Sequence, residues 1–343
     1  MIKFCFVVLC MLFINSMDAK AFELSYVNKL YNVLEEKHSS TIDFKKISLE
    51  GIQIINEFDD DFRLFSSDTK AYLYCKNQLV KKYDLPISHN KVSKWVDVIT
   101  DIINTYNKYS LKTEVDKNRL QDMVIENITK NIDKYSRIEP QKNETSKLKF
   151  EIDNNVLVIS SQKFYNGFAE DIKRIVSTNK NIQGLVLDLR DNRGGFFSEA
   201  VKVADLFLDN SLIAYSVEDG NTNYYNSSNG DILDNKKIVV LVNSKTASAA
   251  EIVTAALLEQ SRALVVGTKT FGKGSIQSVY NVLDKNLYVT SGVTYTPSGK
   301  IIDNEGIIPQ ICTGVHNSCS VTDNKNTLKD IILAINLIKN NLG

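Results

Sequence analysis

The sequence contains very few histidines and has no excess of charge of either sign. Forty-one basic residues balance forty-one acidic ones over 343 residues, so the broad positive surface of a dedicated nucleic-acid-binding protein is absent. The only histidines are His38, His89 and His316, and none lies between residues 90 and 315. A reaction that needs a proton acceptor in that long stretch must therefore use another side chain. A hydrophobic content of 43% suffices for one large or two modest cores and argues against disorder.

The first 21 residues have the pattern of a secretory signal. Lys3 precedes an apolar stretch from Phe4 to Ile14, and a polar region ends in Ala19-Lys20-Ala21. The apolar stretch is too short to span a bilayer comfortably, which favours a cleaved signal over the alternative, an uncleaved membrane anchor. We expect cleavage after Ala21 and an exported protein, periplasmic or extracellular, with no stable membrane insertion afterwards.

Signal cleavage leaves three cysteines in the mature chain. Cys312 and Cys319 flank the short segment TGVHNS and could close a small disulfide loop, which would make Cys75 the odd thiol. Three unpaired thiols are the alternative, and the sequence does not decide between them. A metal site is disfavoured because His316 is the only imidazole nearby, and no metal or organic cofactor is expected.

The remaining chain changes its pattern near residue 145. From Leu24 to Ile138, apolar residues recur at three- and four-residue spacing, which predicts a helical N-terminal domain over residues 22–140. Residues 148–315 alternate short apolar, β-branched runs with helical patterns, as in an α/β fold with a sheet covered by helices. A C-terminal tail and helix occupy residues 316–343. The expected strands and helices of the core are 156–160, 168–177, 184–190, 198–208, 238–243, 249–259 and 263–267.

The stretch GTKTFGKGS, residues 267–275, comes close to a phosphate-binding loop. Such a loop needs Ser or Thr directly after the lysine to coordinate magnesium, and a following helix whose N–H groups bind phosphate. Gly274 occupies the hydroxyl position, and the following SIQSVYNVL is rich in β-branched and aromatic residues. Nucleotide hydrolysis is therefore a weak alternative, and Lys273 needs another role.

Ser248 is the best candidate partner for this lysine. The run IVVLV passes through a tight turn of small residues into a helical pattern, and Ser248 falls at the junction. There a hydroxyl can be exposed, and the N–H of Ala249 can stabilise an oxyanion. Without a histidine, Lys273 is the remaining base, provided that burial lowers its pKa. The simpler alternatives are an N-cap for Ser248 and a solvated charge for Lys273. Ser244 and Ser275 lack the helix-start position.

Four blocks resemble, in order, those of the C-terminal processing peptidases, also called tail-specific proteases. The blocks are DLRDNRGGFFSEAVKVADLFL, VVLVNSKTASAAEI, ALVVGTKTFGKGSIQ and YTPSGKIIDNEGIIPQI. The resemblance implies a crotonase/Clp-protease-like α/β core with Ser248 as nucleophile and Lys273 as general base. It implies that Gln277 orients the lysine amine, and that the backbone N–H groups of Gly194 and Ala249 form the oxyanion hole.

Some neighbouring residues have roles that the resemblance does not settle. Glu259 stands where some members of that family place an acidic residue of supporting role, and an exposed helix carboxylate is the alternative. Asp188 and Arg190 are interpreted as a structural pair or as strand-end charges. Arg193 replaces the family's usual proline, and only about ten linking residues separate the helical segment from the first core strand. That is too few for the family's PDZ domain, so its C-terminal specificity is not carried over.

The sequence therefore predicts an exported serine endopeptidase with a Ser/Lys dyad. Its partner would be a protein or peptide substrate, which it would cleave in unfolded or C-terminal segments. The alternative is a catalytically inactive scaffold of the same fold that binds a protein or ligand. A homo-oligomer or an activating partner is left open, as is the role of the N-terminal domain.

Overall fold

The computed structural model describes most of the chain after the predicted signal, which itself lies outside the described residues together with His89 and His316. The described residues are 24–87, 92–141, 148–228, 230–282, 284–314, 319 and 327–340. They divide into two compact units. The first comprises the chain up to Glu36, Thr41–Glu139 and Tyr280–Leu287, and the second comprises Lys37–Ser40, Pro140–Val279 and the chain from Tyr288. Across the described residues, every helix is too short or too polar to cross a membrane.

The first unit contains the helices that the apolar spacing predicts. They are α1 (Leu24–Lys37), α2 (Phe44–Ile52), α3 (Ile55–Phe58), α4 (Val92–Tyr109) and α5 (Glu114–Lys130). The apolar face of α4 supplies Trp95 and Ile99 to the core, both fully buried. The side chains of Asp43 and Thr113 accept hydrogen bonds from backbone N–H groups at the starts of α2 and α5.

The prediction of a helical N-terminal domain did not include the three-stranded antiparallel sheet that this unit also holds. Its strands are β1 (Phe62–Ser66), β2 (Lys70–Cys75) and β3 (Gln78–Asp84). In β1 and β2 the side chains alternate between buried and exposed, with Phe62, Leu64, Ala71 and Leu73 facing the core. Lys76 and Asn77 both adopt positive φ and form the tight turn that joins β2 to β3. The physical reason is that buried side chains recur every two residues along β1 and β2, as in a strand, rather than every 3.6 residues, as in a helix.

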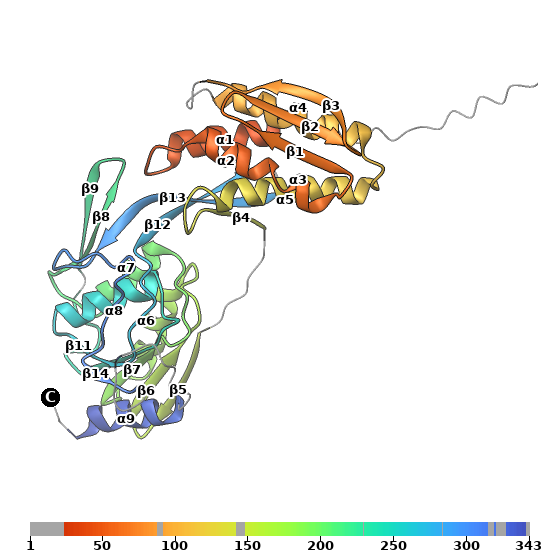
Figure 1. Ribbon diagram of the computed structural model, residues 1–343. Helices are drawn as coiled ribbons and strands as arrows, with labels where there is room; N and C mark the ends of the chain where they lie inside the picture. The colour runs from red at the N-terminus through yellow and green to blue at the C-terminus, as the bar shows by residue number, and fades with distance from the viewer. Residues whose placement is uncertain are drawn as a thin grey trace, which may run out of the picture. The chain divides into compact units, whose positions relative to one another are not determined.

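The second unit is built on a six-stranded sheet with the order β14-β11-β10-β7-β6-β5 (Figure 1). All neighbouring strands are parallel except β5, which pairs antiparallel with β6 at the edge. The strands are β5 (Lys149–Asp153), β6 (Val156–Ser160), β7 (Gly184–Asp188), β10 (Lys237–Val242), β11 (Ala263–Gly267) and β14 (Ile311–Cys312). These bounds confirm the expected α/β arrangement and the positions of β6, β7, β10 and β11, whereas β5 and β14 were not predicted.

Both faces of this sheet are covered by helices, which explains why its central strands are apolar throughout. One face packs against α6 (Phe168–Thr178), α7 (Phe197–Asp205) and α8 (Ala249–Glu259). The other face packs against α9 (Thr327–Lys339), as Figure 1 shows. Alternate residues of β10 pack on opposite faces of the sheet. Val240 lies in the core under α8, whereas Val239 and Leu241 pack in the core under α9.

A second sheet carries the segment that follows Lys273. Its order is β12-β13-β8-β9, and β4 pairs with β13 off this path. The strands are β4 (Arg137–Pro140), β8 (Leu212–Glu218), β9 (Asn221–Asn226), β12 (Ser275–Val282) and β13 (Lys285–Tyr295). Only residues 141–148 separate β4 from β5, so the chain passes from one unit to the other without an inserted domain at this point.

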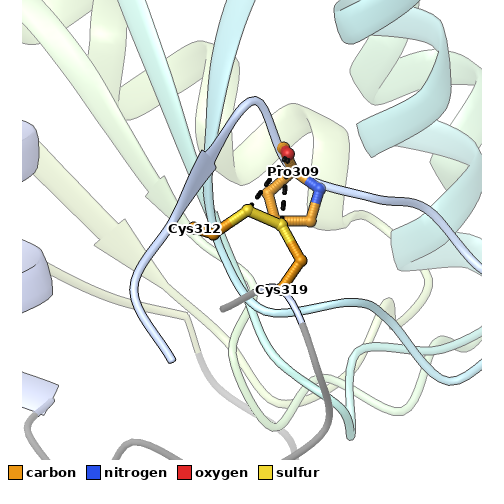
Figure 2. The surroundings of a disulfide bond; sticks show 3 residues. All are labelled: Pro309, Cys312 and Cys319. Carbon is orange, nitrogen blue, oxygen red and sulfur yellow. Dashed lines mark hydrogen bonds between the residues drawn. A yellow bond between two sulfur atoms is a disulfide. The ribbon is translucent and has the colours of Figure 1, made fainter. Parts of the chain in front are cut away.

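A disulfide bond joins Cys312 to Cys319, which resolves the two alternatives that the sequence left open (Figure 2). Cys312 ends β14, and both sulfur atoms lie near the carbonyl oxygen of Pro309, at 3.9 and 3.7 Å. The carbonyl of Cys319 accepts a hydrogen bond from the N–H of Lys269 at 3.1 Å. Cys75 is a free, half-buried thiol.

Candidate active site

Ser248 lies where β10 passes through a short turn into α8, directly before the first helical residue. Its φ of +57° and ψ of −122° are rarely adopted by a residue with a side chain. Such backbone conformations are strained, and they cluster at functional sites. The serine is half-buried and stands at the positive end of the α8 dipole. The local fold therefore presents this hydroxyl at a strained strand-to-helix turn.

Glu251, one turn into α8, is the residue that organises this region. Its side chain is fully buried, and its carboxylate accepts four hydrogen bonds. Oε1 accepts from Thr270 Oγ1 at 2.6 Å and from the N–H of Gly272 at 2.7 Å. Oε2 accepts from the N–H of Ser248 at 2.8 Å and from the N–H of Lys273 at 2.9 Å. The backbone nitrogens of Ser248 and Lys273 are therefore separated by no more than two hydrogen-bond lengths.

Burial raises the pKa of the Glu251 carboxyl above its usual value, because the ionised form loses its hydration. The four donors act in the opposite direction and stabilise the charge, but they offset only part of that cost. The sequence interpretation missed Glu251. The pattern of a serine followed three residues later by a glutamate at a helix start is the signal that could have found it.

Lys273 lies in the irregular segment between β11 and β12. Its Nζ donates a hydrogen bond to Gln277 Oε1 at 3.0 Å, so the amine is held by the side chain four residues further on. Gly272 adopts a φ of +84°, and its backbone packs against Asn304 and Gly306. The segment after Lys273 is the strand β12, not a helix. The near-match to a phosphate-binding loop therefore lacks the helix N-terminus that would bind phosphate.

The loop after β7 brings Gly194 against the serine turn. Gly194 has a φ of +91°, and a Cβ at this position would lie 2.7 Å from Ser248 Cβ and 3.0 Å from the nitrogen of Ala249. Only glycine allows this approach. The N–H of Gly194 donates to Asn192 Oδ1 at 2.9 Å. The N–H of Ala249, the first residue of α8, has no acceptor among the described residues. The two expected oxyanion donors are thus adjacent, and one of them already has a partner.

Further hydrogen bonds join the Gly194 loop to the serine turn. Thr246 Oγ1 donates to the carbonyl of Leu189 at 2.8 Å, and the N–H of Ala247 donates to the carbonyl of Asn192 at 2.9 Å. The N–H of Asp191 donates to the side chain of Asn243 at 3.0 Å. Because the two loops share these bonds, a shift of one moves the other.

The remaining candidates have other contacts or positions. Glu259 accepts two hydrogen bonds from Ser298, from its N–H at 2.8 Å and from its Oγ at 2.9 Å, and these are contacts of a helix-end carboxylate. Arg190 binds Asp188 through two nitrogens, which confirms their interpretation as a structural pair. Ser244 lies within the turn after β10 and Ser275 begins β12, so neither starts a helix.

Comparisons with known proteins find relatives of the unit that contains these residues. The sequence model of the family described as "Peptidase family S41" matches residues 155–313. The chain is 39% identical over 145 residues to a carboxy-terminal-processing protease of Bartonella bacilliformis, covering 41% of this chain and 33% of that protein. It is 33% identical over 205 residues to a probable CtpA-like serine protease of Staphylococcus aureus, covering 57% of this chain and 41% of that protein. The chain thus spans less than half the length of these relatives.

A solved structure matches over a longer range at lower identity. The structure of a lipoprotein from Streptococcus agalactiae is 15% identical, covers 93% of this chain and 97% of its own, and has a TM-score of 0.55. This likeness concerns the fold alone. The segment that matches the family model contains Ser248, Lys273 and Gln277 together with the Gly194 loop. Residues 155–313 therefore match peptidase family S41, whose serine peptidases use a Ser/Lys dyad.

Proposed function

We propose that this chain is an exported serine endopeptidase, with Ser248 as nucleophile and Lys273 as general base on a crotonase/Clp-protease-like core. The observation that carries the proposal is the buried carboxylate of Glu251. Its Oε2 accepts hydrogen bonds from the backbones of both residues, and so keeps the nucleophile turn beside the lysine loop. A structural lysine in a glycine-rich turn has no need of such a connection.

In the first half of the reaction, the neutral amine of Lys273 takes the proton of Ser248 Oγ while this oxygen attacks the carbonyl carbon of a peptide bond. Gln277 fixes the direction of the amine through the 3.0 Å hydrogen bond to Nζ. The tetrahedral intermediate then collapses, the carbon–nitrogen bond breaks, and the lysine ammonium gives its proton to the leaving amine. The product is an ester between Ser248 and the acyl half of the substrate.

In the second half, a water molecule attacks the ester carbonyl, and Lys273 again accepts the proton. Collapse of the second intermediate returns this proton to Ser248 Oγ and releases the carboxylate product. The lysine begins and ends the cycle as a neutral amine, so the reaction consumes only water.

The oxyanion of both intermediates would lie at the N–H of Ala249, aided by the N-terminal end of α8. Gly194 is the second donor. Its N–H must turn from Asn192 Oδ1 toward the substrate oxygen, or donate a bifurcated hydrogen bond to both oxygens. The Gly194 backbone packs directly on Ser248 and Ala249, which supports its role as the second donor.

The proposed substrates are unfolded or C-terminal segments of proteins, since a peptide must be extended to bring its carbonyl to the strained turn. The name of the Bartonella bacilliformis relative refers to carboxy-terminal processing, which supports this choice. The signal pattern over residues 1–21 supports export, as does the disulfide between Cys312 and Cys319.

One observation favours the second candidate function, a binding scaffold without turnover. In the present conformation the Gly194 N–H is bound to Asn192, so the expected oxyanion hole has one donor engaged. A fluorophosphonate probe separates the two functions, because it labels an activated serine covalently and does not label an inert one. Labelling of the wild type that disappears in Ser248→Ala supports the peptidase.

The direct test is cleavage of an unfolded protein by residues 22–343 between pH 6 and 10. Ser248→Ala and Lys273→Ala should both abolish cleavage while the protein stays folded. Ser244→Ala, in the same turn, and Lys269→Ala, four residues before the proposed base, are the matched controls and should retain activity. Cleavage that survives in Ser248→Ala would show that the nucleophile is assigned wrongly.

A further inference from the structure

The C-terminal helix α9 lies outside the region that matches the family model, which ends at residue 313. It nevertheless packs closely on the catalytic unit. Ala334, Ile335 and Ile338 are buried against the sheet face formed by β6, β7, β10 and β11. A Cβ at Gly184, the first residue of β7, would lie 2.7 Å from a methyl group of Ile338, so helix and strand meet with no spare room.

The first turn of α9 also carries a buried charge. Asp330 Oδ2 accepts a hydrogen bond from Arg190 Nη1 at 3.3 Å, across 140 residues of sequence. Arg190 binds Asp188 at the same time, through Nε at 2.8 Å and through Nη2. The side chains of Arg190, Asp188 and Asp330 are only 7%, 12% and 8% exposed. Buried ions of this kind hold a fixed geometry, because a displaced partner leaves an uncompensated charge.

Arg190 lies between the strand β7 and the loop that carries Gly194. It lies two residues after the end of β7 and precedes the loop that leads to Gly194. Leu189, on its other side, donates its N–H to β10 and accepts from Thr246 through its carbonyl. Four residues further on, Gly194 packs on Ser248. The guanidinium therefore anchors one end of the loop whose other end supplies an oxyanion donor.

We infer that Asp330 is a positioning residue for the Gly194 loop: by holding Arg190 from α9, it fixes the loop against the serine turn. The inference rests on the proposed peptidase function for its kinetic consequence, but not for its structural one. Asp188 alone can neutralise Arg190, so the second carboxylate is not needed for charge balance. Its position beneath the loop instead defines where the guanidinium lies, and with it the backbone of residues 189–194.

The kinetic test compares Asp330→Ala with Ile335→Ala. Both variants weaken the docking of the same helix, because Ile335 is 4% exposed in the sheet interface, but only the first removes a contact to Arg190. We expect Asp330→Ala to lower kcat for a peptide substrate at least about tenfold with little change in KM, since ångström-scale misplacement of catalytic groups has costs of this order. Asp330→Asn keeps an acceptor oxygen and should recover part of the rate. Equal kcat losses in Asp330→Ala and Ile335→Ala would overturn the inference, as would a wild-type rate in Asp330→Ala.

A second measurement does not depend on activity. Hydrogen exchange of the Leu189 and Gly194 amides should become faster in Asp330→Ala than in Ile335→Ala, measured where both variants are folded. If the wild type cleaves nothing yet these amides respond in this way, the proposed function fails and the positioning role stands. If Asp330→Ala does not fold, Asp330→Asn is compared with Ile335→Val by the same exchange experiment. Unchanged protection of the two amides would overturn the inference whatever the activity.

Discussion

Replacing Glu251 by glutamine changes one oxygen into an NH₂ group and leaves the shape of the side chain almost unaltered. The carboxylate accepts two hydrogen bonds on each oxygen, whereas the amide can accept on one oxygen only. Whichever way the amide turns, one pair of donors faces the NH₂ group. That pair is either Ser248 with Lys273 or Thr270 with Gly272. At about 1–3 kcal/mol for each buried donor left without an acceptor, the substitution should cost about 2–6 kcal/mol.

This cost is a large part of the free energy of unfolding of an ordinary domain, which is about 5–15 kcal/mol. Urea unfolding of wild type and Glu251→Gln at 15 °C measures it. Glu259→Gln is the matched stability control, because it makes the same change on the same helix at a partly exposed carboxylate that accepts from Ser298. Peptide cleavage, measured where both proteins are folded, should fall sharply in Glu251→Gln. A stability loss no larger than that of Glu259→Gln, together with normal cleavage, would refute this account of the site.

The pH dependence gives an independent check with a definite sign. Burial raises the pKa of Glu251 above that of the unfolded chain, so the folded protein keeps this proton to higher pH. The contribution of the group to stability is complete below the unfolded pKa and is lost as pH rises through the folded pKa. Glutamine has no such proton. The difference in free energy of unfolding between wild type and Glu251→Gln should therefore narrow as pH rises from the unfolded to the folded pKa of Glu251. A difference that widens over this pH range would contradict a raised pKa for Glu251.

Two other substitutions follow from contacts described above. Gly194→Ala places a methyl group 2.7 Å from Ser248 Cβ at a φ of +91°, so we expect at least about a hundredfold loss of cleavage in a protein that still folds. Fluorophosphonate labelling should fall in parallel. Normal labelling would show that the loop does not approach the serine. Cys312→Ser opens the short loop closed by Cys319 and should lower the free energy of unfolding by about 2–3 kcal/mol. Reduction of the wild type should give the same loss, and Cys75→Ser should give none.

The local patterns of the sequence predicted the core strands and helices well. The runs that became β6, β7, β10 and β11 are apolar on both faces, a pattern that buried parallel strands require. The hairpins β1–β3 were missed because their alternation is diluted by surface lysines and the β2–β3 turn is Lys76-Asn77 rather than a glycine turn. Helical periodicity in the flanking segments then dominated the interpretation.

The parts of the site that the sequence did not predict depend on contacts between distant segments. Glu251 could have been suspected from its spacing to Ser248, but its bonds to Thr270 and Gly272 come from a loop about twenty residues away. The pairing of Asp330 with Arg190 spans 140 residues, and no local pattern announces it. The hydrogen bond of the Gly194 N–H to Asn192 depends on the conformation of the loop, which composition does not encode.

The left-handed backbone at Ser248 has a consequence for how this lineage could change. A non-glycine residue held at such φ and ψ costs on the order of 1–3 kcal/mol, and glycine would relieve most of it. A homologous protein that no longer needed the hydroxyl would therefore gain stability when glycine replaces this serine, and selection would not remove such a mutation. On the proposed peptidase function, the need for the serine oxygen offsets this strain. The proposal therefore makes Ser248→Gly the expected first step of any relative that abandons catalysis and keeps the fold.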